Sequence, residues 1–142
     1  MLGMLVVTHG RLAEDLVQAV QTIVGPVEGL GAVSIGWNDE VDDATRMIEE
    51  AIARVDSGQG VLILTDMFGG TPTNLGLSLH ERVKIEIVTG VNLPMLIKFA
   101  NLREEMPLHD AAARIAEQGR EAIHVASHVL DAAQRGPDRE PQ

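Results

Sequence analysis

Short, continuous apolar runs alternate along this chain with longer segments in which apolar residues recur every three or four positions. Runs of the first kind are typical of strands buried on both faces of a sheet. They cover residues 2–8, 31–36, 60–65 and 84–89. Segments of the second kind predict helices. They cover residues 11–24, 40–55, 93–101 and 108–119, with a further short helix expected to end near Leu79.

The regular alternation of strands and helices predicts an α/β fold. We expect a doubly wound, three-layer αβα sandwich, in which helices cover both faces of a mostly parallel central sheet. Residues 122–129 differ from the other segments because their apolar residues alternate: Ile123, Val125 and Val129 fall on one side. This period of two predicts a last strand.

The length of 142 residues corresponds to one domain with a substantial core. Residues 131–142 contain glycine, two prolines and paired charges without an apolar pattern. Such a composition is typical of a chain end that does not pack. We therefore predict a domain over 1–130 and a flexible tail over 131–142.

The composition excludes several functional classes. The net charge is −10 and aromatic residues make up 2% of the chain, so neither phosphate backbones nor stacked bases are expected partners. The absence of cysteine excludes disulfides, thiolate catalysis and thiolate metal sites. The N-terminus lacks a basic signal-peptide region, and its apolar run is too short to cross a bilayer. We expect a cytoplasmic protein that acts on no nucleic acid.

Two strands of the predicted sheet end at polar residues with catalytic potential. His9 follows the first apolar run, and Asp66 follows the third. The carboxyl ends of parallel strands share one edge, and neighbouring strands lie about 4.8 Å apart, so the two side chains can touch if their strands are adjacent. A carboxylate that accepts from one imidazole nitrogen leaves the lone pair of the other free to attack. This pairing predicts a nucleophilic His9 oriented by Asp66.

A glycine turn after Asp66 supplies a candidate anion site. In Gly69-Gly70-Thr71-Pro72, the threonine suits a helix N-cap and the proline suits the first helical turn. Glycines allow backbone amides to face an anion, and a helix N-terminus favours negative charge. We predict that Gly69, Gly70 and Thr71 bind a phosphoryl group carried on His9, with no metal and no cofactor.

Three ordered motifs resemble the mannose-family enzyme IIA domain of the bacterial phosphoenolpyruvate-dependent sugar phosphotransferase system. They are Thr8-His9-Gly10, Asp66 with the glycine turn, and the segment 90–95, which reads Gly-Val-Asn-Leu-Pro-Met. The likeness covers residues 1–130. It implies a phosphotransferase whose His9 accepts phosphate from the carrier protein HPr and passes it to an enzyme IIB partner. It also implies that Asp66 holds Nδ1 and that Thr71 lies near the phosphate.

The resemblance further implies a homodimer whose final antiparallel edge strand is exchanged between subunits, in agreement with the alternation over 122–129. We expect any IIB partner to be a separate protein, with the membrane reached only through a transporter complex. Met67 and Phe68 adjoin the predicted site and would suit docking by HPr.

Other functions use similar chemistry. A regulatory switch would use the same phosphorylated histidine without sugar transport. The dihydroxyacetone-kinase phosphotransfer subunit resembles this fold, but the glycine turn and the segment 90–95 favour the mannose type. Histidine phosphatases carry arginine where Thr8 stands here. Gly3 and Gly10 do not form a dinucleotide fingerprint.

Overall fold

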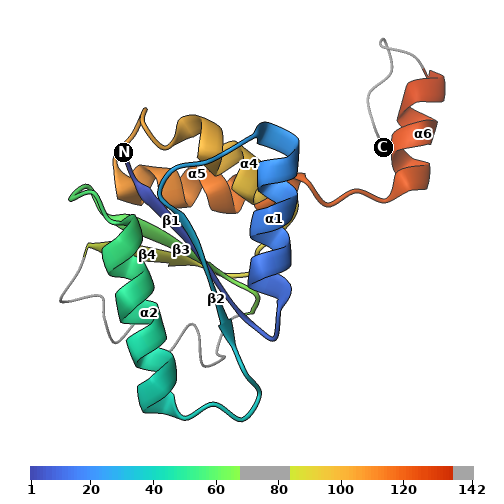
Figure 1. Cartoon of the computed structure of the whole chain (residues 1–142). Coiled ribbons are helices and arrows are strands. Elements are labelled where there is room, and N and C mark those ends of the chain that lie inside the picture. Colours follow the sequence, from blue (N-terminus) through green and yellow to red (C-terminus); the bar gives the residue numbers. More distant parts are fainter. Residues whose placement is uncertain (68–83, 136–142) are drawn as a thin grey trace.

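The computed structural model describes residues 1–67 and 84–135 of the chain, and these residues contain a parallel sheet (Figure 1). Its strands are β1 (Gly3–His9), β2 (Leu30–Ile35), β3 (Val61–Thr65) and β4 (Ile85–Val88). The order is β2-β1-β3-β4, and all three pairings are parallel. The four apolar runs therefore form strands within one or two residues of their predicted bounds.

Helices cover both faces of this sheet, as the alternation predicts (Figure 1). The helices of the described ranges are α1 (Leu12–Val24), α2 (Val41–Val55), α4 (Leu93–Leu102), α5 (Leu108–Glu121) and α6 (Ala126–Arg135). Helices α1, α4 and α5 pack on one face, and α2 packs on the other. The α/β class and the layered architecture are confirmed. The short helix expected to end near Leu79 lies outside the described residues.

Strand β1 lies inside the sheet and contributes to both halves of the core. Met4 and Val6 point toward α1, α4 and α5, whereas Leu5 and Val7 point toward α2. All four side chains are fully buried. Because β1 is bonded to β2 on one side and to β3 on the other, its last residue has a well-fixed position.

Gly3 allows the end of α2 to approach the start of β1 closely. A Cβ atom at this position would lie 2.5 Å from the carbonyl oxygen of Val55. Such a distance cannot be relieved by rotating a side chain, because the obstructing atom belongs to the backbone. The absence of a side chain at residue 3 therefore sets the spacing between α2 and the sheet.

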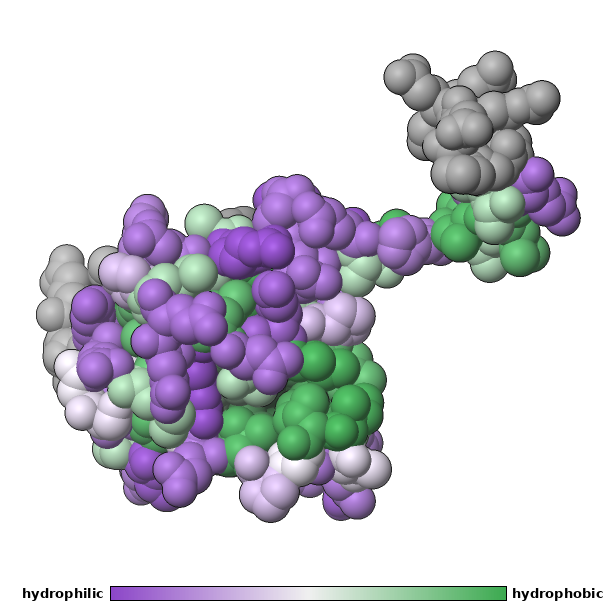
Figure 2. Space-filling model, turned by 90° about the horizontal axis from the view of Figure 1, so that it is seen from above, coloured by the Kyte–Doolittle hydropathy of each residue, from purple (hydrophilic) through white to green (hydrophobic). Residues whose placement is uncertain are grey.

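The predicted last strand over 122–129 is wrong for this structure. Residues 123–125 have no regular structure, and α6 begins at Ala126. Figure 1 shows this helix standing away from the sheet, and Figure 2 shows hydrophobic residues on the projecting segment. A strand requires a neighbour to bond its backbone, whereas a helix bonds its own. None of the strands in the described ranges pairs with this segment, and from Ala126 it forms a helix.

The predicted boundary between domain and tail falls inside this helix, since α6 continues to Arg135. The division at residue 130 therefore stays a prediction. Across the two described ranges, no helix is long and apolar enough to cross a membrane.

Candidate functional site

The candidate site lies where the winding of the sheet reverses. The chain passes from β1 outward to β2, then returns across β1 to β3 and continues to β4. Strands β1 and β3 therefore flank the reversal, and in open α/β sheets ligands bind beyond the carboxyl ends of such strands. His9 ends β1, and Asp66 directly follows β3. The topology thus places both predicted residues at this position.

The predicted contact between His9 and Asp66 is present. His9 Nδ1 lies 2.9 Å from Asp66 Oδ2, and the backbone N–H of His9 donates to the same oxygen at 3.1 Å. Asp66 Oδ1 accepts from the backbone N–H of Met67 at 2.9 Å. The side chains of His9 and Asp66 are 12% and 18% exposed. The carboxylate is therefore held at both oxygens and fixes one edge of the imidazole.

The protonation of this pair follows from its hydrogen bonds. Burial alone would raise the pKa of Asp66, but hydrogen bonds from the side chain and backbone of His9 hold it below its ordinary value of 3.8. The carboxylate is therefore ionised at neutral pH and can only accept hydrogen bonds. Nδ1 of His9 must then carry the proton in the contact. In a neutral ring, this tautomer leaves the lone pair on Nε2.

Thr8 connects the end of β1 to the start of α1. Its buried hydroxyl oxygen accepts from the backbone N–H of Ala13 at 2.7 Å. The N-cap residue of α1, Arg11, makes no side-chain cap, so Thr8 satisfies a first-turn donor from outside the helix. Thr8, at the position where histidine phosphatases carry arginine, therefore has a structural role here.

A tryptophan that the sequence analysis did not single out contacts the histidine. The indole of Trp37 stacks on the imidazole of His9, with ring centroids 4.9 Å apart and an interplanar angle of 12°. Trp37 follows β2 and is 76% exposed. The one available signal was its position directly after a strand on the same sheet edge as His9, in a chain with a single tryptophan.

The remaining predicted residues divide into two groups. Met67, which was predicted to suit docking by HPr, is exposed beside Asp66, and its role in docking stays a prediction. Gly69, Gly70, Thr71 and Phe68 lie outside the described residues, so the predicted phosphate-binding turn stays a prediction. In the ranges 1–67 and 84–135, no cluster of three or more histidine or acidic side chains is arranged to hold a metal ion.

Asn92, in the third motif, has a structural role. Its Oδ1 accepts from the N–H of Met95, which caps α4, and its Nδ2 donates to the carbonyl of Gly119 on α5. The asparagine therefore joins α4 to α5 and takes no part in the contact between His9 and Asp66.

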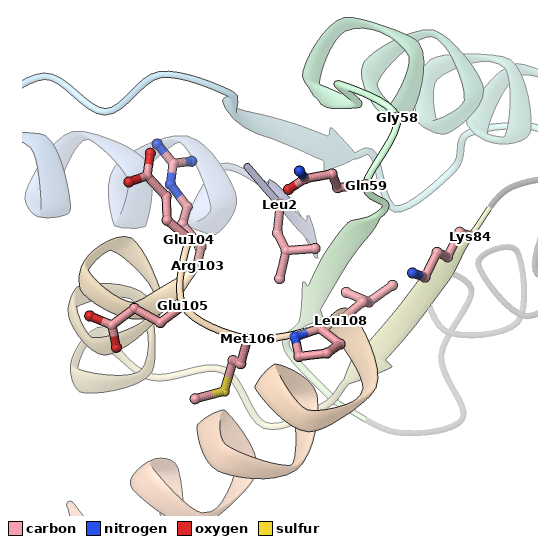
Figure 3. Close-up of a pocket in the computed structure, with 10 residues that line it drawn as sticks. Leu2, Gly58, Gln59, Lys84, Arg103, Glu104, Glu105, Met106 and Leu108 are labelled. Carbon is pink, nitrogen blue, oxygen red and sulfur yellow. The ribbon is translucent and has the colours of Figure 1, made fainter.

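A cavity of about 460 Å³ lies at the opposite edge of the sheet, near the amino ends of the strands (Figure 3). Leu2, Gln59 and Lys84, which precede β1, β3 and β4, line it together with Arg103. Burial lowers the pKa of Arg103, against the opposing effect of Glu104 and Glu28, and its Nη1 has no hydrogen-bond partner among the described residues. This cavity is separated from His9 by the length of the strands.

A parallel sheet with helices on both faces and a carboxylate-bound histidine at its reversal defines a doubly wound α/β domain, whose ligand sites lie at this position. The comparison with protein families narrows this class. The family model described as "PTS system fructose IIA component" matches residues 3–116. The chain belongs to this family, the mannose-type enzyme IIA components of the phosphotransferase system.

Individual relatives agree with this assignment. The chain is 33% identical over 123 residues to the mannose-specific EIIAB component of Escherichia coli, covering 82% of this chain and 36% of that protein. It is 27% identical over 132 residues to the fructose-specific EIIA component of Bacillus subtilis, covering 92% and 90%. The chain thus spans about a third of the length of the EIIAB relatives.

A solved structure confirms the fold. The mannose/sorbose-specific IIA subunit from Enterococcus faecalis superposes with a TM-score of 0.79 and 25% identity, covering 87% of this chain and 93% of that one. The predicted family resemblance is therefore confirmed.

Proposed function

We propose that this protein is a phosphoryl relay of the sugar phosphotransferase system, in which His9 accepts the phosphoryl group. The observation that carries the proposal is the hydrogen bond from His9 Nδ1 to the ionised Asp66, which leaves Nε2 as the nucleophile. Membership in the enzyme IIA family supports the same assignment.

The transfer forms one N–P bond and breaks another, and it releases no proton. The Nε2 lone pair of His9 attacks the phosphorus of a phosphohistidine donor, and a new N–P bond forms. The donor's N–P bond breaks, and its electron pair returns to the donor nitrogen. Nδ1 keeps its proton, and the carboxylate of Asp66 stabilises the positive charge that the substituted imidazole acquires. The onward transfer repeats these steps with His9 as donor, so no water is consumed.

The proposed partners follow from the family. We assign HPr as the phosphoryl donor and an enzyme IIB protein as the acceptor, in the cytoplasm, with Gly69, Gly70 and Thr71 binding the phosphoryl group. We also assign a homodimer. The exposed apolar residues near the C-terminus support it: Ile123, Val125, Val129 and Leu130 are each more than half exposed.

The test is phosphorylation by purified phosphoenolpyruvate, enzyme I and HPr. We expect an acid-labile adduct on the wild-type protein, and no adduct on the His9→Ala variant. Addition of a IIB protein should remove the label from the wild type. His109→Ala is a matched control, since this exposed histidine lies far from Asp66 and pairs with Glu86.

An unlabelled wild type in the presence of active donors would refute the proposal. Label that persists in His9→Ala would refute the assigned residue. If the label stays on the protein with every IIB protein tested, the onward transfer is refuted, but His9 remains the residue that accepts phosphate.

A further inference from the structure

The stack between Trp37 and His9 is held from both sides. The loop that carries Trp37 is closed by Asp39, whose Oδ2 accepts from the N–H of Gly36 at 2.7 Å. On the other side, the N–H of Gly10 donates to the carbonyl of Ile35 at 2.9 Å. The residues that adjoin Trp37 and His9 in sequence are therefore fixed relative to each other.

Gly10 forms the turn directly after His9. Its φ angle is +58°, and a Cβ atom built there would lie 3.9 Å from Trp37 Nε1. A glycine adopts this left-handed conformation without strain. The position therefore favours glycine because of its backbone conformation, whereas a Cβ atom there would make only ordinary van der Waals contact with the indole.

Asp66 and Trp37 restrain different motions of the imidazole. The bond to Asp66 fixes the position of Nδ1, but a single hydrogen bond leaves the ring plane free to tilt. The parallel indole fixes that plane, as expected for offset-stacked aromatic rings. An indole face also attracts a cation, and the imidazole becomes cationic when its second nitrogen gains a substituent.

We infer that Trp37 is a positioning residue for phosphoryl transfer: its indole face orients the imidazole of His9 and stabilises the cationic, phosphorylated ring. This inference rests on the proposed function of His9. It extends that function to a residue on the loop after β2. An exposed cation–π contact of ordinary strength corresponds to roughly a two- to fivefold change in rate or equilibrium.

Potassium phosphoramidate provides the test because this small donor needs no docking surface. We expect Trp37→Ala to slow its phosphorylation of His9 roughly two- to fivefold, and Trp37→Phe to retain most of the wild-type rate because it keeps an aromatic face. Val41→Ala removes an exposed apolar side chain at the start of α2 and should behave as wild type. Circular dichroism verifies that each variant is folded.

Three results would overturn the inference. One is a wild-type rate for Trp37→Ala with phosphoramidate; a defect confined to phospho-HPr would then make Trp37 a docking residue. The second is an equal loss in the alanine and phenylalanine variants, which contradicts stacking. The third is a tryptophan emission spectrum that does not change in His9→Ala, since Trp37 is the single tryptophan and should report loss of the imidazole.

Failure of the proposed function gives a different pattern. In that case neither phosphoramidate nor phospho-HPr labels wild-type His9, while the emission of the unphosphorylated protein still responds to His9→Ala. A labelled wild type with an unaffected Trp37→Ala refutes the positioning role alone.

Discussion

One carboxylate organises the residues around His9. Asp66 accepts two hydrogen bonds from His9 through Oδ2 and one from Met67 through Oδ1. These hydrogen bonds fix the backbone and the ring of His9 and the backbone of Met67. The charge of the carboxylate determines which imidazole nitrogen is protonated. An asparagine at this position has the same shape, but one of its two terminal atoms is a donor.

This arrangement predicts a dependence of stability on pH. The pKa of Asp66 is lower in the folded protein than its ordinary value of 3.8. Its contribution is therefore complete above that value and is lost as the pH falls toward the lowered folded value. Measured by urea unfolding between roughly pH 5 and 3, the free energy of unfolding should fall more steeply for the wild type than for Asp66→Asn.

The His9→Ala variant tests the cause of this dependence. It removes the side-chain donor and keeps the backbone donor, so its slope should lie between those of the other two proteins. Equal slopes for the wild type and Asp66→Asn would contradict the assignment.

The contact between His9 and Asp66 could be predicted because strand ends in a parallel sheet share an edge. The stack of Trp37 could not. It depends on the turn closed by Gly36 and Asp39, and a loop of that kind has no periodicity to indicate where its side chains point. The motif residues 69–71 lie outside the described range, so the predicted phosphate contacts rest on sequence alone.

At the scale of elements, buried strands and amphipathic helices were predicted closely because their patterns reflect burial in this chain. The segment 122–129 failed because alternation indicates a strand only where a neighbour is present to pair with it. Val125 and Val129 are also four residues apart, which suits one side of a helix. The pattern was compatible with both structures, and the surroundings decided between them.

The start of α1 depends on the hydroxyl of Thr8. Thr8→Val keeps the shape of the side chain but leaves the buried N–H of Ala13 without its acceptor. We expect a loss of about 1–3 kcal/mol in the free energy of unfolding, measured by urea denaturation. Thr8→Ser keeps the hydroxyl and should lose less. A larger loss in the serine variant would show that the methyl group, rather than the hydrogen bond, holds this turn.

At the scale of the whole molecule, exposed apolar residues occur both on the domain, as at Ile23 of α1, and on α6, at Val129 and Leu130. Those on α6 stand away from the sheet, where the chain itself does not cover them (Figure 1). Exposed apolar patches are typical of interaction sites. The proposed homodimer would bury it.

This proposal predicts an effect on mass in solution. By light scattering, the wild type should have the mass of two chains, and the double variant Val129→Asp, Leu130→Asp should have the mass of one. Ile23→Asp, Val24→Asp places the same two charges on exposed apolar positions of α1 and should remain dimeric. A monomeric wild type, or an unchanged mass in the double variant, would contradict the dimer.

The central place of β1 has a consequence for how the chain unfolds. Amides in the interior strand of a sheet exchange with solvent through large openings, whereas loops and chain ends open at little cost. His9 is the last residue of β1, and its ring is hydrogen-bonded to Asp66, which directly follows the neighbouring strand β3. Fraying of α6 leaves this geometry intact, but any opening that separates β1 from β3 abolishes it. If His9 carries phosphate as proposed, the fraction of protein that can be phosphorylated therefore measures the population with an intact sheet.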